Sequence, residues 1–338
     1  MKVWEITEPH QIRRIEISDA VTPVGSAKVK LLKAGISYSD AEIYSGDTRV
    51  RYPIVPGHQA VGVISEVGEN NRGLAKGQRV FVNPYVPCNS CIGCISGNYE
   101  MCANLKTMGL DTEGLLRDFA VIPVENLYQL PSNVKDNDAL FIEHTAIAVR
   151  VFSELDVQKG EHLAIHGSSI VGLILAQVAL YYQAIPILID NNAYHLECAR
   201  EMNVYYTIDS SVEDAAQKLM QLTGGRGCEK VAHMASSSRA LRSALDFCGN
   251  GAKLAVVGHN LRSILKESAY SDIIDKQLTL IGINNSYDYI ENGINLIANK
   301  AVQPGALVDK EISFDEVPAL LRELEESHYH NNKVIVKL

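Results

Sequence analysis

Four cysteines lie close together near residue 90, and their spacing is suited to binding a metal ion. Cys88, Cys91, Cys94 and Cys102 form a C-x2-C-x2-C-x7-C pattern. Four thiolates at such spacing can surround one Zn²⁺ tetrahedrally, and the intervening residues are small and turn-forming. Two disulfide bonds are the alternative, although C-x-x-C pairs in a chain without a secretion signal favour a metal. The sequence therefore predicts a structural zinc lobe at residues 87–103.

A glycine-containing segment between a strand and a helix predicts a cofactor site. Gly167 and Gly172 match the outer glycines of the dinucleotide fingerprint G-x-G-x-x-G, and Ser169 takes the middle position. Serine is small, and its hydroxyl group could bond a phosphate oxygen. A helix beginning near Ile170 and Val171 would direct its N–H groups toward the phosphates. The alternative is a fold of this type that binds no nucleotide.

Three further positions refine the cofactor prediction. Asp190 ends the next predicted strand, 23 positions after Gly167, where a carboxylate can accept hydrogen bonds from the adenosine ribose. A negative charge there repels a 2′-phosphate, so NAD is favoured over NADP. His195 is close enough in sequence to weaken that preference. Val257 and Gly258, at the end of a later strand, complete the predicted cofactor-binding residues.

The hydrophobic pattern predicts how these residues are positioned. The first part of the chain is β-rich, whereas short apolar runs alternate with helices of about 10–15 residues after residue 150. Six such runs predict the doubly wound parallel sheet of an α/β nucleotide domain. The expected strands there are 162–167, 185–190, 205–208, 230–234, 253–258 and 278–282. The predicted divisions are a β-rich domain at 1–149, the nucleotide domain at 150–285 and a return at 286–338.

Composition limits the classes of partner. A chain of 338 residues predicts about two domains, and its net charge of −9 argues against nucleic acid or an anionic membrane as a partner. The longest apolar run, 170–182, is too short to span a bilayer. The charged N-terminal residues do not resemble a signal peptide, so we expect a cytoplasmic location.

Together these motifs resemble the medium-chain dehydrogenase/reductase superfamily, in its zinc-containing alcohol and polyol dehydrogenase branch. The matching residues are Gly35–Asp40, Pro56–Gln59, the cysteine lobe, Glu143, Gly167–Gly172 and Asp190. They resemble the sorbitol, threonine and sugar-acid dehydrogenases most. The resemblance implies a GroES-like catalytic domain built from both chain ends, an inserted nucleotide domain, and a homodimer or homotetramer.

The resemblance also implies a catalytic metal site, at which this chain departs from the family. The corresponding positions are Ser37, His58, Gln59 and Glu143, where the family usually has cysteine, histidine, glutamate and glutamate. Ser37 and Gln59 remove up to two negative charges, so we expect a weakened metal site. His144 and Glu42 are the nearest replacement ligands in sequence. The resemblance further implies that Ser39 relays a proton and that Asp40 orients His58.

Three functions follow from this pattern. The first is a zinc-containing, NAD-dependent oxidation of a secondary hydroxyl group of a polyol, sugar or sugar acid to a ketone. The second is a metal-independent oxidoreductase of the same fold, and the third is a catalytically decayed nucleotide-binding relative. Both alternatives arise from Ser37 and Gln59. Residues that could select the alcohol or ketone substrate are Tyr38, Tyr44, Arg51, Tyr52, Lys106 and Asn284.

Overall fold

The computed structural model describes residues 1–18, 21–235, 238–258, 267–327 and 333–338, and the chain divides into two compact units. The first unit contains residues 1–143 and 303–338, and the second contains residues 144–302. The change occurs within helix α4 (Ile142–Glu154), close to the expected boundary at 150. The return lies after the expected position of 286, because helix α10 (Ile290–Ala298) belongs to the second unit.

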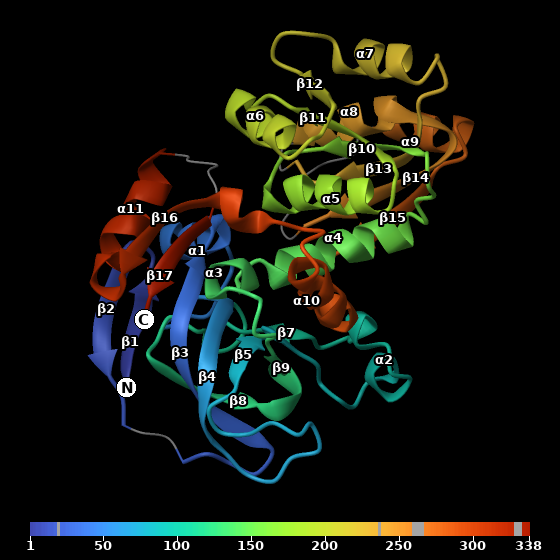
Figure 1. The fold of residues 1–338 in the computed structure, drawn as a ribbon. Helices are drawn as coiled ribbons and strands as arrows, with labels where there is room; N and C mark the ends of the chain where they lie inside the picture. The colour runs from blue at the N-terminus through green and yellow to red at the C-terminus, as the bar shows by residue number, and fades with distance from the viewer. Residues whose placement is uncertain (19–20, 236–237, 259–266, 328–332) are drawn as a thin grey trace. The chain divides into compact units, whose positions relative to one another are not determined.

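The first unit is built on a seven-stranded sheet to which both chain ends contribute. Strand β17 (Lys333–Lys337) lies between β16 (Val308–Ser313) and β3 (Ser26–Ile36), antiparallel to β3, so red and blue strands are neighbours in Figure 1. The sheet continues from β3 through β4 (Gln59–Val67), β5 (Arg79–Val82) and β9 (Leu127–Gln129), while β8 (Phe119–Pro123) also pairs with β3.

Smaller elements complete this unit. They are the paired strands β1 (Lys2–Glu8) and β2 (Gln11–Glu16), the paired strands β6 (Tyr85–Val86) and β7 (Lys106–Thr107), and the helices α1 (Tyr38–Ser45), α2 (Ile92–Ile95), α3 (Asp136–Ala139) and α11 (Val317–Ser327).

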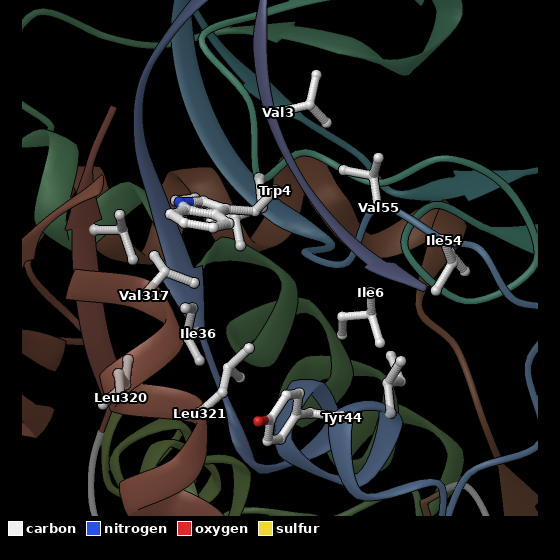
Figure 2. Close-up of a cluster of buried hydrophobic side chains, with 14 of the residues drawn as sticks. Val3, Trp4, Ile6, Ile36, Tyr44, Ile54, Val55, Val317, Leu320 and Leu321 are labelled. Atoms are coloured by element: carbon white, nitrogen blue, oxygen red, sulfur yellow. The ribbon is translucent and has the colours of Figure 1, made fainter. Parts of the chain in front are cut away.

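A hydrophobic cluster joins the N-terminal strands to α11. Trp4 packs with buried side chains from β1, β3, α1 and α11, among them Ile36 and Leu321 (Figure 2). The Trp4 indole Nε1 also donates a hydrogen bond of 2.7 Å to the carbonyl oxygen of Phe314. Because an indole N–H loses water when it is buried, this bond removes a desolvation cost and anchors the C-terminal segment to β1.

The second unit is a six-stranded parallel sheet with packed helices (Figure 1). Its strand order is β12-β11-β10-β13-β14-β15, the order of a doubly wound dinucleotide fold, as the sequence predicted. The strands are β10 (His162–His166), β11 (Ile185–Asp190), β12 (Tyr206–Asp209), β13 (Cys228–His233), β14 (Cys248–Val257) and β15 (Thr279–Ile283). The helices are α5 (Ile170–Tyr181), α6 (Ala193–Glu201), α7 (Ala215–Leu222), α8 (Ser238–Phe247) and α9 (Glu267–Asp275).

Two local predictions were wrong. The pattern Ser210-x-x-Glu213 resembles a capping box and predicts that a helix begins there, but α7 begins later, because Asp214 is the N-cap and accepts a 3.0 Å hydrogen bond from the Gln217 N–H. The β-branched residues between turn signals in 114–121 predict a strand over that whole segment, but β8 begins only at Phe119, because the preceding backbone pairs with the loop before β4. In that loop contact, Gly114 donates to the Val55 carbonyl at 2.8 Å. No described helix is long and apolar enough to cross a membrane.

Candidate functional site

The four cysteines of the lobe converge on a common centre. Their sulfur atoms all lie within 4.8 Å of one another. The Cys91 and Cys94 sulfurs are 3.6 Å apart, and those of Cys88 and Cys94 are 4.0 Å apart. Four sulfurs at a Zn–S distance of about 2.3 Å would be about 3.8 Å from one another, so the arrangement fits tetrahedral zinc. None of the four forms a disulfide bond in this structure, so the arrangement favours a metal site over the disulfide alternative.

The electrostatics of the lobe also suit a cation. Hydrogen bonds from the Ser90 backbone and hydroxyl lower the pKa of Cys88 to about 5, whereas desolvation raises the pKa of Cys94 to about 12. Four crowded sulfurs therefore cannot all ionise without a neutralising ion, and a bound metal deprotonates its thiol ligands. Gly93 allows the tight fold of the lobe, because a Cβ there would lie 2.6 Å from the Met101 carbonyl oxygen.

A polar group surrounds His58 in the first unit. Ser37 and Asp40 form a capping box at the start of α1, in which the Ser37 N–H donates to Asp40 Oδ2 at 2.9 Å. The hydroxyl oxygens of Ser37 and Ser39 are 2.8 Å apart, and the Ser37 hydroxyl donates to Asp40 Oδ2 at 3.2 Å. Asp40 Oδ1 accepts from the Gly57 N–H at 3.0 Å and lies 3.9 Å from His58 Nδ1. His58 Nδ1 is buried without a hydrogen-bond partner.

A second polar network adjoins the other side of His58. His58 Nε2 lies 3.8 Å from Glu143 Oε2. Glu143 accepts a 2.7 Å hydrogen bond from the Tyr85 hydroxyl and a 2.5 Å hydrogen bond from the Gln59 amide Nε2. The Lys333 ammonium donates to the Gln59 carbonyl Oε1. The structure thus brings together five of the predicted site residues: Ser37, Asp40, His58, Gln59 and Glu143.

Lys333 is the residue that the sequence did not single out. It begins β17, is 0% exposed, and its Nζ lies 5.3 Å from the centre of the Phe141 ring. Burial lowers the pKa of Lys333 to about 7, while the carboxylates of Glu143 and Asp40 act in the opposite direction. An ammonium group in a parallel or antiparallel sheet usually reaches solvent, so full burial here indicates a specific partner.

These residues do not make a complete ligand set for the second metal of the family. Among the described residues, the four cysteines are the only group of three or more His, Cys, Asp and Glu ligand atoms close enough to share an ion. Glu42 and His144 therefore bring no third ligand to His58 and Glu143. The available oxygen of Ser37 is a weak ligand that is already hydrogen-bonded.

The glycine loop of the second unit has the shape of a phosphate cradle. A Cβ at Gly172 would lie 2.1 Å from the Gly167 carbonyl oxygen, and Gly167 has a φ of +110°. Ser169, the N-cap of α5, is exposed, and its side chain makes no capping hydrogen bond. The first helical N–H groups, at Ile170 and Val171, are therefore available to an anion, which fits a dinucleotide pyrophosphate.

The other predicted cofactor residues lie at the same end of the parallel sheet. Asp190, at the end of β11, accepts hydrogen bonds from the backbone N–H groups of Ser168 at 2.5 Å and Asn192 at 2.9 Å. Val257 ends β14, and the following Gly258 has a φ of +131°. His195 is buried in α6, which does not support contact with a 2′-phosphate.

Two of the residues suggested for substrate selection have structural contacts instead. The Tyr44 hydroxyl donates to the His10 carbonyl at 3.0 Å, and the Tyr52 hydroxyl donates to the Ile43 carbonyl at 2.5 Å. These bonds hold the loops around α1. Tyr38 remains 45% exposed at the start of α1 and lies between Ser37 and Ser39 in the sequence. Of these three tyrosines it is therefore the best candidate for contact with a substrate.

A buried pair of histidines lies beside the glycine loop, and the sequence pattern did not indicate it. His166 ends β10, His233 ends β13, and their Nδ1 atoms are 3.4 Å apart. Burial lowers the pKa of His166 to about 4, although the Asp190 carboxylate acts in the opposite direction. Burial and the neighbouring His166 lower the pKa of His233 to about 3. Both rings are therefore neutral in the folded protein near neutral pH.

This pair predicts an acid-labile second unit. Unfolded histidine has a pKa of about 6.5, so as the pH falls below that value the unfolded chain binds protons that the folded chain does not. Each ring should cost about 2 kcal/mol of stability at pH 5. His233→Gln should reduce this acid dependence, measured by hydrogen exchange in β10 and β13 at pH 5 and 7. His162→Gln on β10 is the control, and an unchanged acid dependence in His233→Gln would contradict the assignment.

Comparison with known proteins places both units in one family. The family model for the alcohol dehydrogenase GroES-like domain matches residues 24–132, and the model for zinc-binding dehydrogenases matches residues 171–299. A sorbitol dehydrogenase from Halalkalibacterium halodurans is 28% identical over 294 residues, covering 86% of this chain and 85% of the relative.

Two crystal structures have the same fold over the whole chain. Galactitol-1-phosphate dehydrogenase from Escherichia coli has a TM-score of 0.92 at 24% identity, covering 100% of both chains. A short chain alcohol dehydrogenase from Escherichia coli CFT073, in complex with NADH, has a TM-score of 0.91 at 26% identity and covers 100% of this chain and 99% of its own. The chain therefore belongs to the medium-chain dehydrogenase/reductase superfamily, as an enzyme of its zinc-type alcohol and polyol dehydrogenase branch.

Proposed function

We propose that the protein is an NAD-dependent oxidoreductase that interconverts a secondary hydroxyl group of a polyol, sugar or sugar acid with the corresponding ketone. The observation that carries this proposal is the hydrogen-bonded pair of Ser37 and Ser39 hydroxyls, joined to Asp40 beside His58. Hydroxyl groups in such a chain can pass a proton to or from a substrate oxygen. The sorbitol dehydrogenase relative supports a polyol as the substrate class.

The roles of the polar residues follow from their contacts. Ser39 is half-buried, so its hydroxyl can reach a substrate oxygen while remaining bonded to Ser37. When the substrate hydroxyl loses its proton, Ser39 accepts it and donates its own proton to Ser37, which donates its proton to the Asp40 carboxylate. The reverse transfer supplies the proton to the substrate oxygen when a ketone is reduced. The Asp40 carboxylate accepts from Ser37 and fixes the direction of this chain. Bound NAD supplies the acceptor for the hydride.

Asp190 supports NAD as the preferred cofactor. Its carboxylate lies at the end of β11 and accepts hydrogen bonds from the backbone N–H groups of Ser168 in the glycine loop and of Asn191 and Asn192, which follow Asp190 in the chain. A carboxylate at this position can accept hydrogen bonds from the ribose hydroxyl groups and repels a 2′-phosphate.

The proposal predicts turnover that depends on Ser39. The purified protein should reduce NAD, and NADP much more slowly, with at least one substrate from a panel of polyols, sugars and sugar acids. Ser39→Ala should lower kcat/KM by about 10²-fold or more, because it removes the proton relay. Ser45→Ala, at the other end of α1, is the matched control and should retain activity.

Two outcomes would refute the proposal. Absence of hydride transfer in either direction across the panel, with NAD bound to the protein, would exclude this substrate class. Equal activity of Ser39→Ala and the unmodified protein would exclude the hydroxyl relay.

A further inference from the structure

At the position where the family resemblance implies a second metal ion, side chains of this chain form hydrogen bonds with one another instead. Of the four expected ligand positions, His58 keeps its Nε2 available, whereas Ser37, Gln59 and Glu143 are all engaged in hydrogen bonds with other side chains. The partners of Ser37 are local, whereas Gln59, Glu143, Tyr85 and Lys333 come from separate segments of the first unit. The network of these four residues is therefore a property of the folded unit.

The Gln59 amide has a single possible orientation in this network. An ammonium group can only donate and an ionised carboxylate can only accept, so Gln59 must present Oε1 to Lys333 and Nε2 to Glu143. Oε1 is the only atom of this side chain that could bind a hard cation, and the positively charged end of Lys333 lies against it. A divalent cation approaching Gln59 would therefore meet electrostatic repulsion.

Glu143 and Ser37 are similarly engaged. Both oxygens of Glu143 accept hydrogen bonds, one from Tyr85 and one from Gln59, and the second of these also faces His58. Ser37 caps α1, and serine is among the residues that helix N-caps favour. Ser37 thus contributes to helix stability where a cysteine would contribute a metal ligand.

The space for this network is created by Gly35 on β3. A Cβ at this position would lie 3.0 Å from Gln59 Oε1 and 3.2 Å from Lys333 Nζ. The fully buried Lys333 side chain lies against Gly35, Gln59 and Phe141. Its positive charge offsets the negative charge of Glu143 inside the unit, a role that a metal cation fills in a zinc site.

We propose that this chain binds one metal ion, at the cysteine lobe, and that the Lys333–Gln59–Glu143–Tyr85 network replaces the second, catalytic metal of its family. The inference concerns the proposed active site, but it does not depend on the substrate. A metal measurement tests it even if the proposed hydroxyl chemistry is wrong.

Metal content of the full chain provides the test. After dialysis against a weak chelator, mass spectrometry should find one zinc per chain in the unmodified protein, and Glu143→Gln should leave that value unchanged. Ser37→Cys combined with Gln59→Glu should raise it to two, because the pair restores a thiolate and a carboxylate. Ser45→Cys combined with Gln78→Glu adds the same groups elsewhere and should leave one zinc.

Cobalt substitution identifies the site. The single cobalt ion of the unmodified protein should show the strong charge-transfer absorption of a four-thiolate site. Two zinc ions per chain, or one ion lost in Glu143→Gln, would overturn the proposal. A folded Ser37→Cys, Gln59→Glu variant that still binds one zinc would also overturn it, since these residues would then not account for the loss of the second site.

Discussion

Cys94→Ser should remove the zinc of the lobe and unfold residues 87–103. Cys94 is buried, and its sulfur lies within 4.0 Å of the sulfurs of Cys88 and Cys91. A structural zinc contributes its binding energy directly to folding, about 10–16 kcal/mol in small zinc domains, and the lobe has little hydrophobic core of its own. The effect should therefore be large and confined to the lobe.

Limited proteolysis and metal analysis provide the readouts. In the variant, cleavage between residues 87 and 103 should become rapid, and zinc content should fall by one ion per chain. Cys198→Ser, which changes a buried cysteine in α6, should keep the lobe protected. A zinc-containing, protease-resistant lobe in Cys94→Ser would show that the cysteines do not form the metal site.

Lys333→Met should destabilise the first unit by about 1–3 kcal/mol at pH 9, where burial leaves the Lys333 amine neutral in the fold, because the buried Gln59 Oε1 loses its hydrogen-bond donor. Urea denaturation followed by Trp4 fluorescence measures this unit specifically, since Trp4 is the only tryptophan in the chain and lies in the core of this unit.

Two comparisons separate the hydrogen bond from the charge. At pH 6 the variant should lose less stability than at pH 9, because it also removes the cost of burying the Lys333 charge. Lys337→Met, on the same strand but with a side chain 63% exposed, should change stability little at either pH. Equal losses from Lys333→Met at the two pH values would indicate a packing role for Lys333 alone.

The same lysine gives a pH signature. Its folded pKa of about 7 lies below the unfolded value, so between about pH 7 and 10 the unfolded chain binds the extra proton. Stability of the first unit should therefore rise with pH across this interval, and Lys333→Met should remove that rise.

The sequence predicted the second unit well because its pattern is local. A buried parallel strand is a short apolar run, and each run in this unit is followed by a helix, so the six strands and the doubly wound fold were predictable. Helix α8 and the strands β1 and β2 were not predicted, although the residues of α8 alternate polar and apolar with helical spacing. Asp214 was overlooked as a cap because Ser210 and Glu213 match the capping-box pattern without beginning a helix.

The ligand positions were predictable from motif resemblance, but their partners were not. Ser37, His58, Gln59 and Glu143 were expected near one another, and the structure brings them together. Lys333 comes from a strand near the end of the chain, and a lysine at a strand end usually lies at the surface. Its burial depends on pairing between β17 and β3, a contact about 300 residues apart in sequence that no local pattern encodes.

The position of β17 inside the sheet, between β16 and β3, constrains how the protein folds during its synthesis. Translation completes the second unit before β17 exists, so the nascent chain can fold that unit while the first 143 residues still lack the strand that covers the edge of β3. Until residues 333–337 leave the ribosome, the edge of β3 is an unpaired template for another chain, and Gln59 has no lysine to contact. Chaperone demand should therefore be greatest late in translation, for the part of the protein that was made first.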